Sequence, residues 1–174
     1  MITKKYIAVA IFAVLAISCS VVDRLLTFSI DNQTSVTIPA GFPVNTPIDF
    51  SVESTSNSST VFENNNTKAD LVKDVKLKEL KLTITDPANK TFSFLKSIHI
   101  FISTDANDEI ELAFLDDINS TSSIITLTPT AEKLDKYIKA PSFTLRVKAV
   151  TKETVTQNIT VKADMRFQVT ADPF

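Results

Sequence analysis

Strict alternation of apolar and polar residues near the C-terminus constrains the fold more than any other feature of the chain. Over residues 158–170, every second residue is apolar and the residues between them are polar. The apolar positions are Ile159, Val161, Ala163, Met165, Phe167 and Val169. A helix would scatter this set around its circumference, whereas a strand places the whole set on one face. The segment is therefore predicted to be a long β-strand with one buried face and one face toward water.

The same period of two recurs along the rest of the chain. Shorter alternating segments lie at 26–30, 36–38, 48–52, 80–84, 98–102, 110–114, 125–127 and 143–149. The apolar residues at 75 and 77 are out of phase with those at 80–84, which predicts a β-bulge near Lys78 and Glu79. About nine strands with turn signals between them are typical of an antiparallel β-sandwich. The predicted class is mainly β, of the Ig-like or Greek-key type.

Two short helices are predicted as crossovers within this sandwich. Residues 131–138 place apolar residues on one helical face, Thr130 is a candidate N-cap, and Pro129 prevents extension backwards. Residues 67–74 give a weaker helical pattern. Between them and the preceding strand, residues 53–66 are rich in Ser, Thr and Asn, and such a composition buries too little apolar surface to offset the entropy of ordering. That segment is predicted to be a flexible loop.

The chain contains a single glycine, Gly41. Glycine-rich phosphate loops, the dinucleotide-binding fingerprint and the nucleophile elbow each need glycines at fixed spacings, so all three are excluded. No other cofactor motif is present, and no cofactor is expected. Tight turns have to use Asn, Asp and Pro instead, as at 86–89 and 107–108.

The first eighteen residues have the three-part organisation of an export signal. Lys4 and Lys5 are followed by an unbroken apolar run from Tyr6 to Ile17, and small polar residues come next. A membrane-spanning helix needs about 20 apolar residues, and this run is shorter. It falls in the range of roughly 7–15 residues that signal-peptide cores occupy. Residues 1–18 are therefore predicted to be a signal peptide.

The sequence Leu15-Ala16-Ile17-Ser18-Cys19 resembles the lipobox of bacterial lipoproteins, in which a peptidase cuts before a cysteine that then carries lipid. The family usually has leucine three residues before the cysteine, and here Ala16 holds that place. The chain is similar in this respect to lipoproteins of Bacteroidota, where looser forms are common. An ordinary secretory signal cut near Ser18 or Ser20, with Cys19 incidental, is the alternative. Cys19 is the only cysteine, so no disulfide within the chain accounts for it.

The resemblance implies a partner, a location and a division of the chain. Cys19 would carry a diacylglyceryl group and often a third acyl chain, and two or more chains anchor a protein stably. Residues 19–24 would form a lipidated tether, and residues 25–174 the β-sandwich domain. Ser20 rather than aspartate follows the cysteine, which by resemblance favours the outer membrane, with the domain periplasmic or exposed at the cell surface.

The charge of the chain gives no reason to expect a nucleic-acid partner. The formal net charge is −2, and loss of Lys4 and Lys5 with the signal would make it −4. Nucleic-acid binding calls for clusters of basic residues, which this chain lacks.

The most acidic segment is the candidate for a metal site. Asp105, Asn107 and Glu109 alternate as the first ligands of a calcium loop do, and Ca²⁺ prefers several oxygen ligands on a tight turn. Ile110 stands where that loop needs glycine, and it also begins an alternating segment. An acidic hairpin turn built on residues 107–108 is the favoured interpretation, so no metal is assigned.

No residue set amounts to a catalytic site. His99 is the only histidine, and it lies between Ile98 and Ile100, so it is predicted to be an exposed strand residue. One histidine and a lipidated cysteine cannot build a zinc site. A glycosidase would need two facing carboxylates, which no sequence rule selects here. The phenylalanines at alternating strand positions, such as Phe143 and Phe167, are predicted to be core.

Three functional hypotheses follow. The first is a non-enzymatic lipoprotein of the cell envelope that binds or assembles with another protein or a glycan. The second is a cell-surface accessory protein that binds a carbohydrate, or that binds another ligand in a calcium-dependent manner. The third is a hydrolase with a carboxylate pair, which the missing motifs make the weakest.

Overall fold

A computed structural model of the chain describes residues 26–45 and 47–172. The predicted signal peptide (1–18), Cys19 and the predicted tether (19–24) lie outside the described residues. Within the described part, no helix has both the length and the apolar character needed to cross a membrane.

Eight strands dominate the structure. They are β1 (Thr27–Ile38), β2 (Pro47–Thr55), β3 (Val72–Asp86), β4 (Leu95–Ser103), β5 (Ile110–Leu115), β6 (Ile124–Pro129), β7 (Ser142–Thr151) and β8 (Ile159–Ala171). The helical elements are α2 (Ser58–Asn64), α3 (Asp135–Lys139) and two 3₁₀ turns, η1 (Ala69–Leu71) and η2 (Phe92–Phe94).

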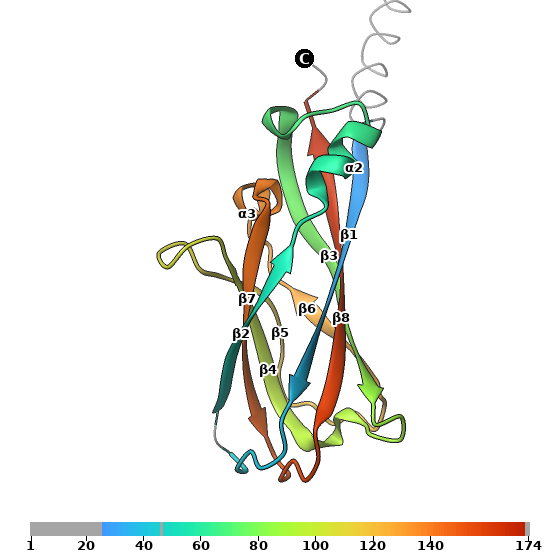
Figure 1. Ribbon diagram of the computed structural model, residues 1–174, viewed down its shortest axis with the longest axis vertical. Helices are drawn as coiled ribbons and strands as arrows, with labels where there is room; N and C mark the ends of the chain where they lie inside the picture. The colour runs from blue at the N-terminus through green and yellow to red at the C-terminus, as the bar shows by residue number, and fades with distance from the viewer. Residues whose placement is uncertain (1–25, 46, 173–174) are drawn as a thin grey trace, which may run out of the picture.

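The strands form an elongated antiparallel sandwich (Figure 1). The hydrogen-bonded order is β1-β8-β3-β6-β5-β4-β7-β2, and β6 continues from one layer into the other because it pairs with both β3 and β5. One layer is thus β1-β8-β3-β6 and the other is β2-β7-β4-β5. Consecutive strands mostly alternate between the layers, which is the double Greek-key order of a jelly roll. The predicted mainly β, antiparallel sandwich is confirmed.

Strand β8 has the two-sided character that its sequence predicts. All six alternating apolar residues of 159–169 are buried, and Phe167 is fully inaccessible to solvent. The strand lies between β1 and β3 and pairs with both, so it is an interior strand of its layer. The predicted bulge is also present, as a register shift between Leu77 and Glu79 of β3.

Strand β1 corrects the predicted number of strands, since the described residues contain eight and not about nine. Segments 26–30 and 36–38 were expected to be separate, but one continuous strand, Thr27–Ile38, joins them and pairs with β8 along its whole length. The period of two is unbroken through Asn32 and Thr34, which occupy inward positions although they are polar. Because the pattern of apolar residues is interrupted there, the sequence suggested a break that the backbone does not have.

The end of the sandwich near α2 holds two further corrections. Residues 53–66, predicted to be a flexible loop, contain the end of β2 and the helix α2. Phe62 of α2 is buried and packs edge-on against Phe28, with ring centroids 6.2 Å apart. This contact gives the polar segment enough apolar burial to order a helix. The predicted helix at 67–74 is wrong, because only η1 is helical and β3 already begins at Val72.

The helix predicted at 131–138 is present but shorter and shifted. It spans Asp135–Lys139, and Leu134 occupies the N-cap position. Thr130 does not cap it, since its hydroxyl donates to the main-chain oxygens of Glu111 and Leu112. Thr130 therefore serves to fix the end of β6 against β5.

Candidate functional site

The acidic turn between β4 and β5 uses its carboxylates to hold its own backbone. Asp108 accepts hydrogen bonds from the main-chain N–H groups of Thr104 and Asp105, at 2.9 and 3.0 Å. Asp105 Oδ1 accepts from the N–H of Asn107 at 2.8 Å. Lys136 of α3 lies 2.7 Å from Asp108 Oδ2. Partial burial raises the pKa of Asp108, but the bonds from Lys136 and Thr104 outweigh it and hold that pKa well below its usual range.

Glu109, the third candidate ligand, points away from the other two. It forms a bidentate ion pair with Arg146 of β7, which also contacts Asp49 of β2 at 3.0 Å. The hydrogen bonds from Arg146 lower the pKa of Glu109. Asp105, Asn107 and Glu109 thus do not converge, and in the described part of the chain no three His, Cys, Asp or Glu side chains are grouped to hold a metal ion.

His99 lies on the outer face of the β2-β7-β4-β5 layer, between two carboxylates. Its Nδ1 is 2.6 Å from Glu111 Oε1 and its Nε2 is 3.2 Å from Asp116 Oδ1. The hydrogen bond with Glu111 is the main cause that raises the pKa of His99 above 6.5. Because both ring nitrogens are engaged, the imidazole has no free nitrogen to serve as a general base for a nucleophile. The predicted outward position is confirmed, with the side chain about one-third exposed.

The same outer face carries two aromatic rings that the sequence analysis did not place there. Phe114, predicted to share the inward face of Ile110 and Leu112, stacks on His99 instead, with centroids 5.8 Å apart. A register shift between β4 and β5 adds one residue to β5 at this point, so the phase of the strand reverses. Phe101 lies beneath the guanidinium of Arg146, 4.7 Å from its ring centroid.

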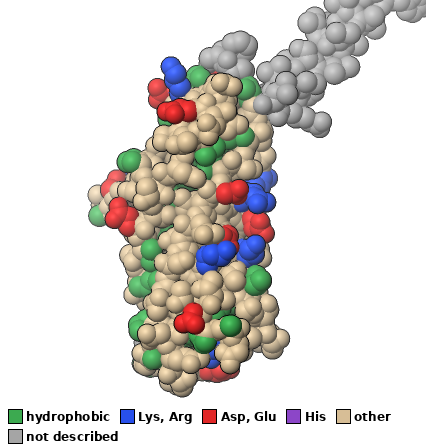
Figure 2. Space-filling model, turned by 45° about the vertical axis from the view of Figure 1, so that its right-hand side comes forward, with side chains coloured by type: hydrophobic (Ala, Val, Ile, Leu, Met, Phe, Trp, Pro, Cys, Tyr) green, Lys and Arg blue, Asp and Glu red, His purple; other side chains and the backbone are tan. Residues whose placement is uncertain are grey.

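The surface charges form mixed pairs. On the outer face of β1 and β8, Arg166 Nε is 2.9 Å from Asp31 and Lys162 Nζ is 3.1 Å from Asp164. Basic and acidic side chains lie next to one another on the face that Figure 2 presents. No phosphate-binding patch of basic residues is seen on that face.

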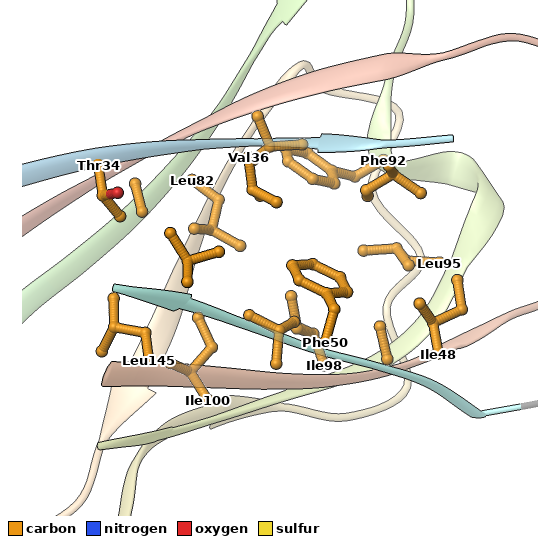
Figure 3. A pocket seen from close by; sticks show the side chains of 16 residues that line it. Thr34, Val36, Ile48, Phe50, Leu82, Phe92, Leu95, Ile98, Ile100 and Leu145 are labelled. Atoms are coloured by element: carbon orange, nitrogen blue, oxygen red, sulfur yellow. The ribbon is translucent and has the colours of Figure 1, made fainter. Parts of the chain in front are cut away.

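An apolar pocket lies between the two layers of the sandwich. It lies at the side of the sandwich where β1 and β2 meet, and Figure 3 shows inward side chains from both layers surrounding it. Its volume is about 40 Å³. Sixteen residues line it, and Thr34 is the only polar one: Thr34, Val36, Ile38, Ile48, Phe50, Val52, Leu82, Phe92, Leu95, Ile98, Ile100, Leu145, Val147, Ala149, Val161 and Ala163.

The pocket reaches the surface through a slot between β1 and β2. Among the described residues, no main-chain hydrogen bond joins these strands, because β1 pairs only with β8 and β2 only with β7. Val36 of β1 and Phe50 and Val52 of β2 point inward, yet each is only half-buried. Apolar side chains that face the interior are thus partly accessible from the side of the molecule.

Polar contacts frame both ends of the slot. At one end, Asn32 Nδ2 donates to the main-chain oxygen of Thr55 at 3.0 Å and Ser54 Oγ donates to Asn32 Oδ1 at 2.9 Å. At the other end, the segment that leads from β1 to β2 is bonded to the connection between β7 and β8, with Gly41 N 2.7 Å from the oxygen of Val155. Gly41 has φ +94°, a conformation that favours glycine.

Small side chains on the neighbouring strands leave the space open. Ala163 of β8 lies opposite Thr34 of β1, and Ala149 of β7 lies opposite Ile48 of β2. Both alanines are buried and line the pocket. The sequence shows alanine at these inward positions, but only the strand order brings the two together, so sequence reasoning missed the site.

Comparisons with known proteins leave the chain without an assigned family. No family model and no curated protein sequence matches it. Among solved structures, the decameric BFDV capsid protein is similar at TM-score 0.36 and 9% identity, with 82% of this chain and 99% of that chain covered. A structure of carbohydrate-binding modules from the β-sandwich superfamily is similar at TM-score 0.31 and 9% identity, covering 79% of this chain and 54% of that one.

Proposed function

We propose that the protein is a lipid-anchored envelope lipoprotein that acts as a non-enzymatic binding module. Cys19 would carry the anchor, and the jelly-roll domain would be presented from the outer membrane to the periplasm or the cell surface. The signal-like residues 1–18 and the lipobox-like sequence before Cys19 support the anchor.

The apolar pocket between β1 and β2 is the observation that carries the binding role. Concave sites lined by apolar side chains are the usual form of small-molecule sites. The absence of a catalytic group near it supports a binding role over a chemical one, because every pocket-lining side chain except that of Thr34 is apolar. The only histidine lies on the outer face of a sheet and is held by two carboxylates.

Metabolic labelling with a fatty-acid analogue tests the anchor. The wild-type protein should take up the label, and Cys19→Ala should lose it and collect in the soluble envelope fraction or remain as the uncut precursor. Equal labelling of both proteins would refute the anchor at Cys19. A cleaved but unlabelled wild-type protein would favour the ordinary secretory signal instead. Separation of inner and outer membranes by density then tests the predicted location.

The second candidate function is the binding of a glycan, or the calcium-dependent binding of another ligand, at the cell surface. Phe101 and Phe114 on the outer face, next to Glu109 and Glu111, are the observation that favours it. Calorimetry with Ca²⁺ separates the two candidates. We expect a dissociation constant no tighter than about 10⁻⁴–10⁻³ M. Micromolar affinity that Asp105→Ala abolishes would support the second candidate.

A further inference from the structure

We infer that the pocket between β1 and β2 binds the end of an alkyl chain of an uncharged, single-chain amphiphile, whose headgroup stays outside the slot. This inference rests on the proposed binding function and names the ligand class of the same site.

The lining of the pocket selects an apolar ligand. Thr34 supplies the only polar side chain among the sixteen lining residues. A buried water needs two to four polar partners, and a polar ligand atom without a hydrogen-bond partner costs free energy on burial. Water and polar groups are therefore disfavoured inside, whereas methylene groups are stabilised by leaving water.

The size of the pocket selects a chain rather than a ring. An engineered apolar cavity of about 150 Å³ takes up benzene, whereas this pocket has a volume of about 40 Å³. The slot also lies between two strands and is closed at both ends, by Asn32 with Ser54 and by the segment that contains Gly41. A narrow opening of this kind admits an extended chain from the side.

The rim of the slot selects the headgroup. The outward residues of β1 beside the pocket are Gln33, Ser35 and Thr37, and those of β2 are Asp49, Ser51 and Glu53. Neither strand contains lysine or arginine. The cations opposite the rim on the neighbouring strands are already engaged: Arg146 pairs with Asp49, Lys162 pairs with Asp164, and Lys148 lies over the ring of Phe101. A carboxylate or phosphate headgroup would have to compete for these cations, whereas hydroxyl groups find acceptors and donors on the rim itself.

Photo-cross-linking in intact envelopes tests this assignment on the full-length, anchored protein. The probe is a monodecanoylglycerol with a diazirine near the end of its chain, and mass spectrometry of peptides locates the adducts. We expect adducts on pocket-lining segments of β1, β2 and β7. Excess unlabelled monodecanoylglycerol should remove them, whereas glycerol should not and decanoate should compete more weakly. Adducts only on segments that do not line the pocket, or equal competition by glycerol, would overturn the assignment.

Two variants that fill the pocket, and a matched control, test whether the lipid probe is cross-linked because it binds in the pocket. Ala163→Leu fills the pocket from β8 and should lower cross-linking about tenfold or more, a loss equivalent to about 1.4 kcal/mol. Ala149→Leu fills it from β7 and replaces the first variant if that one fails to fold, as judged by protease resistance. Thr126→Leu adds a leucine at an exposed position of β6, on the side of the sandwich away from the slot, and should leave cross-linking unchanged. Equal cross-linking in folded filled variants and control would overturn the proposal.

The same envelopes distinguish this occupant from a protein strand added to the slot. A photo-reactive phenylalanine derivative at the exposed position Ser51 should give no protein-sized adduct. A specific polypeptide adduct there, together with no lipid adduct in the pocket, would assign the slot to a protein partner and refute the alkyl-chain ligand. If the lipid probe gives no cross-link while Cys19 still takes up the fatty-acid label, the alkyl-chain ligand is refuted but the anchored binding module is not. Failure of this inference is therefore distinguishable from failure of the proposed function.

Discussion

The two sides of the sandwich close in different ways. On one side, β6 pairs with β3 through residues 124–127 and with β5 through residues 128–129, so main-chain hydrogen bonds run from layer to layer. On the other side, β1 and β2 are joined by the side chain of Asn32 at one end and by the connecting segment at the other. The first side is sealed by backbone, and the second leaves a slot over an apolar pocket.

The difference shows how a jelly roll can carry a binding site without losing its core. Main-chain bonds across β6 fix the spacing of the layers, and Leu127 and Leu112 are fully buried on that side. The β1–β2 side can then stay underpacked, because alanines at 149 and 163 remove volume there without removing any strand pairing. Interiors are normally packed as densely as organic crystals, so a local deficit is informative.

Deletion of a phenylalanine ring from the filled core and from the pocket wall should give the largest contrast. Phe167→Ala should cost about 3–5 kcal/mol in the free energy of unfolding, because Phe167 is fully buried. Phe50→Ala should cost about 1–2 kcal/mol, since its ring is only half-buried beside the slot. Urea unfolding of a chain that begins at Asp23 measures both, with Arg166→Ala as a surface control within about 0.5 kcal/mol. Equal costs for the two phenylalanines would remove the contrast.

An alanine-to-leucine substitution should be tolerated on the β1–β2 side of the sandwich and should destabilise the β5–β6 side. Ala113 of β5 is buried beside β6, and Ala113→Leu should lower stability by about 1–3 kcal/mol through overpacking. Ala163→Leu should change it by less than about 1 kcal/mol, because the added methyl groups enter the pocket. Denaturant midpoints of the two variants decide the matter. A larger loss for Ala163→Leu would mean that the pocket cannot accept carbon atoms.

Removal of the side-chain bridge should loosen the β1–β2 side selectively. Asn32→Ala deletes the bond to Thr55 and leaves the buried hydroxyl of Ser54 without its acceptor, which should cost about 1 kcal/mol. Hydrogen exchange followed by mass spectrometry should show faster exchange in β1 and unchanged exchange in β6. Uniform acceleration in all strands would contradict a local role for Asn32.

The smallest expected effect is a pH response on the sealed side. His99 bridges β4 and β5 through Glu111, and its pKa in the folded protein is raised above 6.5. Its protonated form therefore contributes stability that is fully present below about pH 6.5 and lost as the pH rises through the folded pKa. The loss should stay below about 1 kcal/mol, because the pair is partly exposed. NMR titration should give a pKa above 6.5 that Glu111→Gln lowers, and an unchanged value would refute the role of Glu111.

The sequence predicted those parts of the fold that depend on local periodicity. The buried face of β8 and the bulge at Lys78–Glu79 follow from the spacing of apolar residues alone. Phe114 could not be placed in this way, because the register between β4 and β5 reverses its phase. The continuity of β1 was hidden by Asn32, whose polar inward position makes sense only once Ser54 is seen beside it.

The candidate site could not be predicted from local sequence patterns. Its two alanines, Ala149 and Ala163, come from strands that the order β1-β8 and β7-β2 places on opposite layers of one pocket. Strand order is set by pairings distant in sequence, and no single segment encodes it. The acidic residues that did attract attention, such as Asp108, proved to stabilise their own turn.

A crystal structure of the chain from Asp23, determined under xenon pressure, tests the central claim of an accessible apolar pocket most directly. Dry apolar cavities take up xenon. We expect a xenon atom among Val36, Phe50 and Ala163, no ordered water at that place, and no main-chain hydrogen bond between β1 and β2. Ordered water with polar partners inside, or β1 and β2 paired along their edges with no xenon between the layers, would contradict the account.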